Sequence, residues 1–272
     1  MRVDQDCPGA ISVRRSTSAE RVMWITPDRV FYVGLLGIPS SRSFGAISLY
    51  VALDSPVRIS IQGGAWETGN LAVVQPYTSH SVACDSRHIA VIHVEPESVD
   101  SARLPALLRQ ASGLVTCSDL YARVMHCHEA LLRNGRQAEA SMFNFDELVF
   151  GERLPGRSVD PRIARVLQRI CNDPSSPASA QDCADQVHLS FSRFLHLFKS
   201  EVGSSFRSFR TWKRARSLLH YVVDQRTTLT DVALGAGYPD STHFSHTIRQ
   251  VYGLKPKDIF AGSRKLRVIG PA

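Results

Sequence analysis

Apolar and polar residues alternate with a short period in the first part of the chain. Between about residues 10 and 100, segments rich in β-branched and aromatic residues recur about every ten residues, separated by Gly, Pro, Asp and Ser. In residues 56–62, Val57, Ile59 and Ile61 alternate with Arg58 and Ser60, which is typical of a half-buried strand. Several short strands at this spacing predict a β-sandwich or β-barrel.

From about residue 101 to residue 150 the apolar residues recur with a helical period instead. The segments are 104–111 (LPALLRQA), 118–135 (SDLYARVMHCHEALLRNG), with Ser118 as the expected N-cap, and 137–150 (QAEASMFNFDELVF). They predict a helical hairpin that packs either on the barrel or on a second subunit. Residues 151–159 (GERLPGRSV) lose this period and are expected to form a linker.

A second helical region begins at Asp160 and Pro161, an N-cap residue followed by proline at the first helical position. Ser179 and Asp182 have the spacing of a capping box that opens a short helix, and Ser190 is placed to cap the next one. A short helix, a tight turn and a second capped helix predict a helix-turn-helix motif. The polar face of its second helix carries Ser192, Leu195, His196 and Lys199 at positions i, i+3, i+4 and i+7.

The same motif occurs twice. Residues 189–203 (LSFSRFLHLFKSEVG) align with residues 239–253 (PDSTHFSHTIRQVYG) at an offset of 50, so that Phe194 matches Phe244 and Lys199 matches Arg249. The offset transfers the outer face of the first motif to Thr242, Ser245, His246 and Arg249, with Ser241 beside them. Two such helices on one rigid unit could read adjacent segments of the major groove, one helical turn or about 34 Å apart.

A long helix over residues 205–224 is predicted to hold the two motifs apart. Its apolar stripe includes Phe209, Trp212 and Leu219, and the rest of its surface is basic, with Arg214 among the residues expected to meet DNA. The alternative is that some of these arginines only form a solvent-exposed face of the helix and do not contact DNA.

Charge supports a nucleic-acid partner for the second part of the chain. Residues 158–272 contain 17 Lys and Arg against 9 Asp and Glu, whereas residues 1–157 contain 15 against 16. A basic domain beside a near-neutral one suits attraction to phosphates. We find no apolar run long enough to span a membrane and no secretion signal, and the six scattered cysteines suit a reducing compartment. These features predict a cytoplasmic protein.

Three segments together resemble the DNA-binding domain of the AraC/XylS family of bacterial transcription regulators: SFSRFLHLFKSEVGSSF, WKRARSLL and LTDVALGAGYPDSTHFSHTIRQVYGLKP. The resemblance covers residues 160–262. It implies a double-stranded promoter as the partner, contact with RNA polymerase and a homodimer. The base-facing roles that it implies fall on Ser192, Leu195 and His196 in the first motif and on Ser241, Thr242 and His246 in the second, while Arg193 and Arg249 would contact the DNA backbone or base edges.

The chain departs from the family at His246, at Ile248, where members often have Phe, and at Leu218. Members often have Arg where His246 stands, so a bidentate contact to guanine is not expected there. Leu218 stands where a smaller residue is common. These differences leave the operator sequence unassigned.

The N-terminal part resembles the family's cupin-like sensor barrel through residues 69–82 (GNLAVVQPYTSHSV), which place His80 where the cupin pattern has a histidine. We therefore take His80 as a candidate contact for a small-molecule effector. A metal site would need further ligands on adjacent strands, for which His88 and His93 are the nearby residues. On a helix, His126 and His128 would point about 200 degrees apart. No metal, cofactor or catalytic residue is predicted.

The whole sequence thus predicts an α+β protein. Residues 1–150 form a cupin-like β-barrel with trailing helices, residues 151–159 a linker, and residues 160–262 an all-α domain with two helix-turn-helix motifs joined by a long helix. Residues 263–272 form a basic tail. The leading interpretation is a sequence-specific regulator and not an enzyme. The alternatives are a metal-dependent cupin enzyme fused to a DNA-binding tail and an architectural DNA-binding protein without a ligand.

Overall fold

Two β-sheets and three groups of helices make up the computed structural model, which describes residues 20–133, 143–222, 228–263 and 266–270. The larger sheet has the strand order β10-β1-β2-β8-β3-β6-β9, and the smaller one has the order β5-β4-β7. The strands are β1 (Arg21–Ile25), β2 (Arg29–Leu35), β3 (Ile47–Ala52), β4 (Val57–Ile61), β5 (Glu67–Gly69), β6 (Leu71–Val74), β7 (His80–Cys84), β8 (His88–Val94), β9 (Gly113–Leu114) and β10 (Leu266–Ile269).

Burial explains why the strands of the larger sheet lack a polar face. All six residues of β3 are buried, because one face of the larger sheet packs toward the smaller sheet and the other is covered by helices. The two sheets with the space between them are called the barrel below. In the smaller sheet, β4 keeps the predicted alternation from Val57 to Ile59, with Val57 and Ile59 buried and Arg58 exposed. The alternation ends at Ser60, which is buried because its hydroxyl donates to the Gly64 carbonyl, while Ile61 is half-buried. The prediction of a β-rich N-terminal domain is confirmed.

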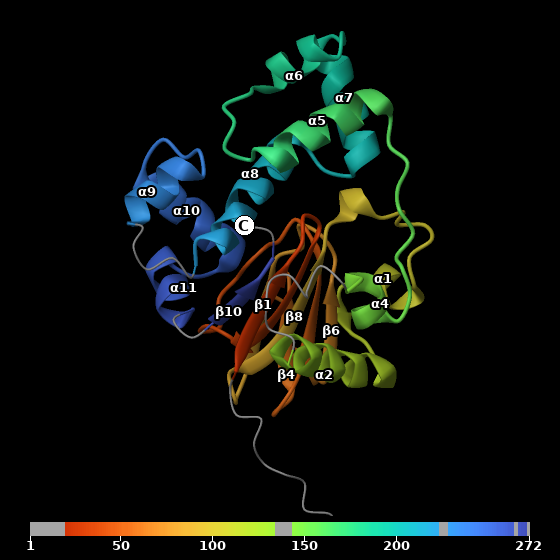
Figure 1. The fold of residues 1–272 in the computed structure, drawn as a ribbon, viewed down its shortest axis with the longest axis vertical. Coiled ribbons are helices and arrows are strands. Elements are labelled where there is room, and N and C mark those ends of the chain that lie inside the picture. Colours follow the sequence, from red (N-terminus) through yellow and green to blue (C-terminus); the bar gives the residue numbers. More distant parts are fainter. Residues whose placement is uncertain (1–19, 134–142, 223–227, 264–265, 271–272) are drawn as a thin grey trace, which may run out of the picture.

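The predicted helical segment packs on the larger sheet of the same chain. Helices α1 (Ala106–Arg109), α2 (Ser118–Arg133) and α4 (Phe145–Phe150) cover its outer face (Figure 1). Val124 and Cys127 of α2 are fully buried in one cluster with Phe31 of β2 and Trp24 of β1. Residues 134–142, which include the start of the segment predicted at 137–150, lie outside the described residues.

The C-terminal helices begin where their capping residues predict. They are α5 (Pro161–Asn172), α6 (Ala180–Gln186), α7 (Phe191–Val202), α8 (Phe206–Ser217), α9 (Leu229–Gly235), α10 (Ser241–Tyr252) and α11 (Pro256–Gly262). The side chain of Asp160 accepts a hydrogen bond from the Arg162 amide, and Ser179 and Asp182 form the predicted capping box. The helix predicted over 205–224 is shorter than expected: α8 ends at Ser217 and tightens into a 3₁₀ turn, Leu218–His220, while residues 223–224 lie outside the described part.

The end of the chain differs from the predicted basic tail. Residues 266–269 form β10, which pairs in parallel with β1 in the register Arg21 with Leu266 and Trp24 with Ile269. Ile269 is buried, so an apolar side chain, not only charge, fixes this segment. The larger sheet therefore includes a strand that follows the helical region in the chain.

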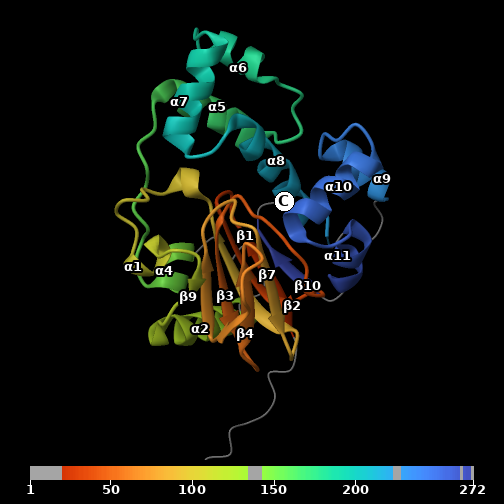
Figure 2. The same ribbon diagram turned by 180° about the vertical axis from the view of Figure 1, so that it is seen from behind.

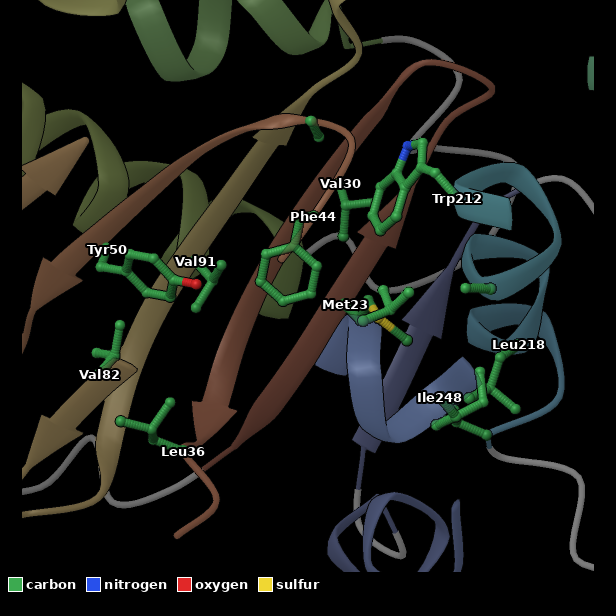
Figure 3. Packing of buried hydrophobic residues seen from close by; sticks show 14 of the residues in the cluster. Met23, Val30, Leu36, Phe44, Tyr50, Val82, Val91, Trp212, Leu218 and Ile248 are labelled. Carbon is green, nitrogen blue, oxygen red and sulfur yellow. The ribbon is translucent and has the colours of Figure 1, made fainter. Parts of the chain in front are cut away.

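The two helix-turn-helix motifs pack differently. The first, α6 and α7, has a core of its own with α5, in which Phe194 and Phe198 are fully buried. The second, α9 and α10, shares a continuous core with the inside of the barrel, where Phe44 and Trp212 meet edge to face at 5.8 Å between ring centroids (Figure 3). Both views place α10 and α11 beside β1 and β10 (Figure 2).

Candidate nucleic-acid interface

Helices α7 and α10 present equivalent faces. The ten residues from Phe191 and the ten from Ser241 have the same order of exposed, half-buried and buried positions. Ser192, Arg193, His196 and Lys199 are exposed on α7, and Ser241, Thr242, His246 and Arg249 are exposed on α10, while Leu195 and Ser245 are half-buried. The structure thus leaves the side chains singled out from the sequence at the surface of the two helices.

Capping fixes the start of the second recognition helix more firmly than that of the first. The Asp240 side chain accepts hydrogen bonds from the Thr242 and His243 amides at 2.8 and 2.7 Å. Ser190 occupies the N-cap of α7, but its side chain makes no capping hydrogen bond. Gly203 and Gly253 end the two helices with φ of +80° and +70°, the left-handed conformation that glycine adopts most readily.

The basic side of α8 is mostly occupied within the protein. Arg214, predicted to meet DNA, is half-buried and donates to the carbonyls of Pro174 and Ser176, each at 3.2 Å. Arg210 donates to the carbonyls of Ser176 and Ala178. These arginines hold the α5–α6 loop against α8, so a DNA contact by Arg214 stays a prediction that would require this loop to release it.

The same loop also reaches the second motif. Gly237, in the turn before α10, has φ of +76°, and a β-carbon at this position would lie 2.4 Å from the Ser175 carbonyl oxygen. Only glycine fits this contact without displacing backbone. Through Ser175 and Gly237, the loop links the two motifs, a role that the sequence pattern does not indicate.

His80, the candidate effector contact, is buried and satisfied internally. Its Nδ1 lies 2.8 Å from the Thr78 carbonyl and its Nε2 lies 2.6 Å from the Tyr50 hydroxyl. The carbonyl can only accept, so Nδ1 carries the proton and Nε2 accepts from Tyr50. Burial lowers the pKa of His80 to about 4, so the ring is neutral at pH 7. His80 therefore positions Tyr50.

His93 is a second buried imidazole, whose Nδ1 lies 2.9 Å from the Ser48 hydroxyl. Burial lowers its pKa to about 3. His88 contacts Asp54 instead, at 3.1 Å. In the parts of the chain that the structure describes, no three His, Cys, Asp or Glu side chains are grouped to hold a metal ion.

The lowered pKa values of the His80 and His93 imidazoles predict a pH-dependent stability. The unfolded state takes up their protons below about pH 6.5 and the folded state does not, so the free energy of unfolding should fall as pH falls from 7 to 5. We expect about 1–2 kcal/mol from each imidazole. Glu95, whose pKa is lowered chiefly by Lys213 and Arg216 against the cost of burial, contributes below this window. Urea unfolding of His80→Gln should show about half the pH dependence, and the exposed control His196→Gln should show all of it.

A cavity of about 490 Å³ lies between the barrel and the second motif. Its wall combines Met23, Phe44 and Tyr50 from the strands and their connections with Tyr252 and Ile259 from α10 and α11. The Arg42 side chain also lines it and is only 5% exposed. Sequence analysis missed Arg42, because it lies in a connection between strands whose packing the apolar pattern does not reveal.

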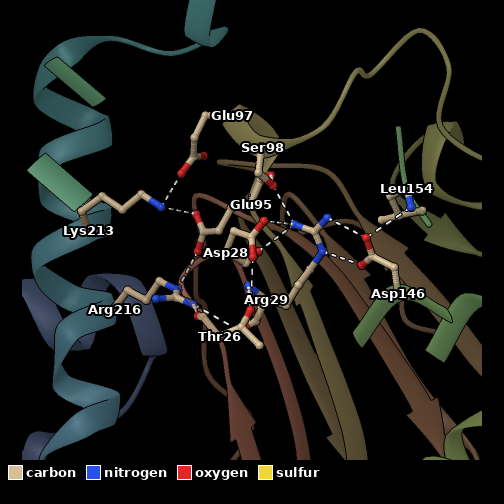
Figure 4. A network of polar contacts seen from close by, with 10 residues as sticks. All are labelled: Thr26, Asp28, Arg29, Glu95, Glu97, Ser98, Asp146, Leu154, Lys213 and Arg216. Atoms are coloured by element: carbon tan, nitrogen blue, oxygen red, sulfur yellow. Dashed lines mark hydrogen bonds and ion pairs between the residues drawn. The ribbon is translucent and has the colours of Figure 1, made fainter. Parts of the chain in front are cut away.

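An ionic cluster joins the barrel to α8 (Figure 4). Glu95, at the end of β8, is fully buried and accepts hydrogen bonds from Trp212 Nε1 and Lys213 Nζ through Oε2, each at 2.8 Å. Its Oε1 lies 2.8 Å from Nε of Arg216, and Glu97 contacts Lys213. Arg216 also donates to the carbonyl of Thr26 at 2.6 Å. Two basic residues of the helix between the motifs are thus committed to the N-terminal domain.

Helix α2 carries the sequence HCHE at residues 126–129, and its described residues form no metal-binding group. His126 is exposed, whereas His128 is buried and its Nε2 lies 2.9 Å from the Glu20 carbonyl, as expected for side chains on opposite faces. Cys127 is fully buried in the core, and burial raises the pKa of its thiol. This cysteine is a packing residue.

Sequence comparisons relate this chain to helix-turn-helix proteins and to two regulators. A family described as "Helix-turn-helix domain" matches residues 183–262. The arabinose operon regulatory protein of Escherichia coli is 25% identical over 152 residues, which are 53% of this chain and 51% of that protein. An uncharacterised HTH-type transcriptional regulator of Haemophilus influenzae is 25% identical over 97 residues, which are 36% and 33% of the two chains. The chain therefore matches about half the length of the first relative and a third of the second.

Comparison of structures extends the likeness to both domains. ToxT from Vibrio cholerae, in an apo variant, superposes with a TM-score of 0.56 at 12% identity, over 86% of this chain and 97% of that one. Wild-type ToxT with a bound unsaturated fatty acid gives 0.55 at 10% identity, over 86% and 95%. At these identities the likeness concerns the fold: a sheet-rich N-terminal domain followed by paired helix-turn-helix motifs. No helix in the described ranges is long and apolar enough to cross a membrane.

Proposed function

We propose that this protein is a sequence-specific transcription regulator whose C-terminal part is a DNA-binding domain of the AraC/XylS type. Its two recognition helices, α7 and α10, would enter adjacent segments of the major groove of a promoter. The observation that carries the proposal is the equivalence of their exposed faces. Two helices with matched polar faces, on a domain with excess positive charge, are what a bipartite operator requires.

Base reading and phosphate attraction fall to different side chains. His196 and His246, at matched positions near the middle of the two helices, are the central candidates for base edges, with Ser192, Ser241 and Thr242 closer to the helix N-termini. Arg193, Lys199 and Arg249 are exposed and would neutralise phosphates. Leu195 and Ser245 are half-buried and would add apolar or short polar contacts.

This division predicts distinct mutant phenotypes. His196→Ala and His246→Ala should each change the preferred DNA sequence, with a loss of about 1–3 kcal/mol at the affected base pairs. Lys199→Ala should instead weaken all sites similarly and reduce the slope of log affinity against log salt by about one. Fluorescence anisotropy with promoter fragments over a salt series measures both quantities. Unchanged binding in all three variants would mean that these faces do not meet DNA.

A direct test of the proposal is selection of bound sequences from a random DNA pool at fixed salt. A regulator should enrich one bipartite motif, whose halves are about one helical turn apart. Equal affinity for every sequence would instead indicate an architectural protein.

We further propose that a small molecule modulates DNA binding through the N-terminal domain. The interdomain cavity supports this, because its wall includes residues of both domains, and the similarly folded ToxT has been solved with a fatty acid bound. His80 would act on such a ligand through Tyr50, which it holds at the cavity wall. Action on a promoter in the cytoplasm, contact with RNA polymerase and a homodimer are parts of the same proposal, supported by the family resemblance. Regulation, not catalysis, is the activity we assign, because the relatives are transcription regulators.

A further inference from the structure

We infer that the interdomain cavity binds an organic anion, a carboxylic acid with an apolar body, whose carboxylate pairs with Arg42. The inference rests on the proposed function, since it specifies the small molecule that would modulate DNA binding. It starts from the state of Arg42 and from the composition of the wall around it.

Arg42 is a buried cation without a counter-ion. Its Nε and Nη2 atoms are buried and have no hydrogen-bond partner, and no described carboxylate lies within ion-pair distance of it. Arginine stays protonated in proteins, so the guanidinium cannot relieve this by losing its proton. A buried charge needs a partner, and a carboxylate matches the two-pronged geometry of a guanidinium.

Among the described residues, the strongly buried basic side chains Arg29, Lys213 and Arg216 each have a carboxylate partner. Arg29 forms a two-pronged pair with Asp146, at 2.8 and 3.1 Å. Lys213 and Arg216 share Glu95. Arg42 differs from these in lining a cavity. A ligand bound in this cavity could therefore supply the carboxylate that Arg42 lacks.

The backbone and the neighbours of Arg42 fix it in that place. Its amide donates to the His80 carbonyl and its carbonyl accepts from the His80 amide, at 2.9 and 3.0 Å, so it is locked to strand β7. Tyr50 donates its hydroxyl proton to His80 and cannot also donate to a ligand. The head group would thus take its hydrogen bonds from Arg42, which favours an acceptor-only group such as a carboxylate.

The rest of the cavity calls for an apolar body. Val30, Leu36 and Val91 contribute from the barrel, and Leu219, Val222 and Leu254 contribute from the C-terminal domain. The other charged lining residues, Arg87 and Asp258, are exposed. A volume of about 490 Å³ is in the range of sites for single small molecules. The ligand would touch the second helix-turn-helix unit and not the first, so it should change how α10 is held.

The test uses the full-length protein and pairs of ligands that differ only in the head group. Calorimetric titration compares dodecanoate, below its micelle concentration, with dodecan-1-ol, and 4-phenylbutanoate with 4-phenylbutan-1-ol. We expect at least one acid to bind about tenfold or more tightly than its alcohol, because only the acid pairs with the guanidinium. Equal binding within both pairs, or no binding of either acid, overturns the inference.

Two variants locate the site. Arg42→Met removes the buried charge at similar length, so it should fold, raise the unfolding temperature of the ligand-free protein and abolish the preference for the acid. Arg42→Lys should keep part of that preference. An acid preference that survives in Arg42→Met would place the anion elsewhere and overturn the assignment.

A parallel measurement separates this inference from the proposed function. The ligand-free protein is assayed for enrichment of specific DNA sequences. Specific DNA binding together with no acid preference refutes the ligand class alone, whereas acid binding together with uniform DNA affinity refutes the regulator.

Discussion

Glu95→Ala is expected to lower the free energy of unfolding by about 3–5 kcal/mol, because it leaves Lys213 and Arg216 buried without their shared carboxylate. Glu97 cannot replace it fully, since its ion pair is with Lys213 and leaves Arg216 without a carboxylate. Urea unfolding, followed by tryptophan fluorescence, measures the change directly, because Trp212 donates to Glu95.

Two control variants test whether the loss of stability comes from the buried ion pairs. Glu95→Gln keeps an acceptor for Trp212 but loses the charge, so it should fall between the natural protein and Glu95→Ala. Glu129→Ala removes an ion pair with Arg133 in which both side chains are largely exposed, and the change should stay within about 0.5 kcal/mol. A loss in Glu95→Ala no larger than in Glu129→Ala would show that the cluster does not hold the domains together.

Phe194→Ala and Phe244→Ala form the second test, since they remove equivalent side chains from the two motifs. Both side chains are fully buried, and each truncation should cost about 3–5 kcal/mol. The two variants should destabilise different parts of the protein. Phe244 belongs to the core that continues into the barrel, whereas Phe194 belongs to the separate core of α5, α6 and α7.

Hydrogen exchange distinguishes the two variants. Phe244→Ala should speed exchange of amides in β1 and β10 as well as in α10, whereas Phe194→Ala should affect α5 to α7 and leave the barrel unchanged. Exchange that rises only within the mutated motif in both variants would contradict a shared core. If the difference is found, a ligand in the barrel has a physical path to one recognition helix and not to the other.

The sequence reveals local features because they depend on residues close together in the chain. The capping box of Ser179 and Asp182 and the Asp240 cap each lie within one turn of helix, and each copy of the repeat is one continuous segment of the chain. The structure has all three. The alternation from Val57 to Ile59 in β4 shows one buried face in the same way. The fold class and the paired motifs follow from such signals.

Features that join distant segments leave no local signal. Glu95 and Lys213 are more than a hundred residues apart, and either would read as an ordinary surface charge by itself. Arg42 lies in a connection with no periodic pattern, and the sequence does not reveal the two carbonyl partners of Arg214. The shorter α8 has a similar origin, because an apolar stripe does not distinguish an α-helix from a helix that tightens at its end.

Strand β10 makes the N-terminal domain depend on a segment that is translated long after its other strands. Strand β1 and its parallel neighbour, Leu266–Ile269, are separated by more than two hundred residues, so this edge of β1 stays unpaired while the helical region between them is translated. A variant that lacks Leu266–Ile269 would keep the edge exposed, so that it should tend to pair edge to edge with other copies.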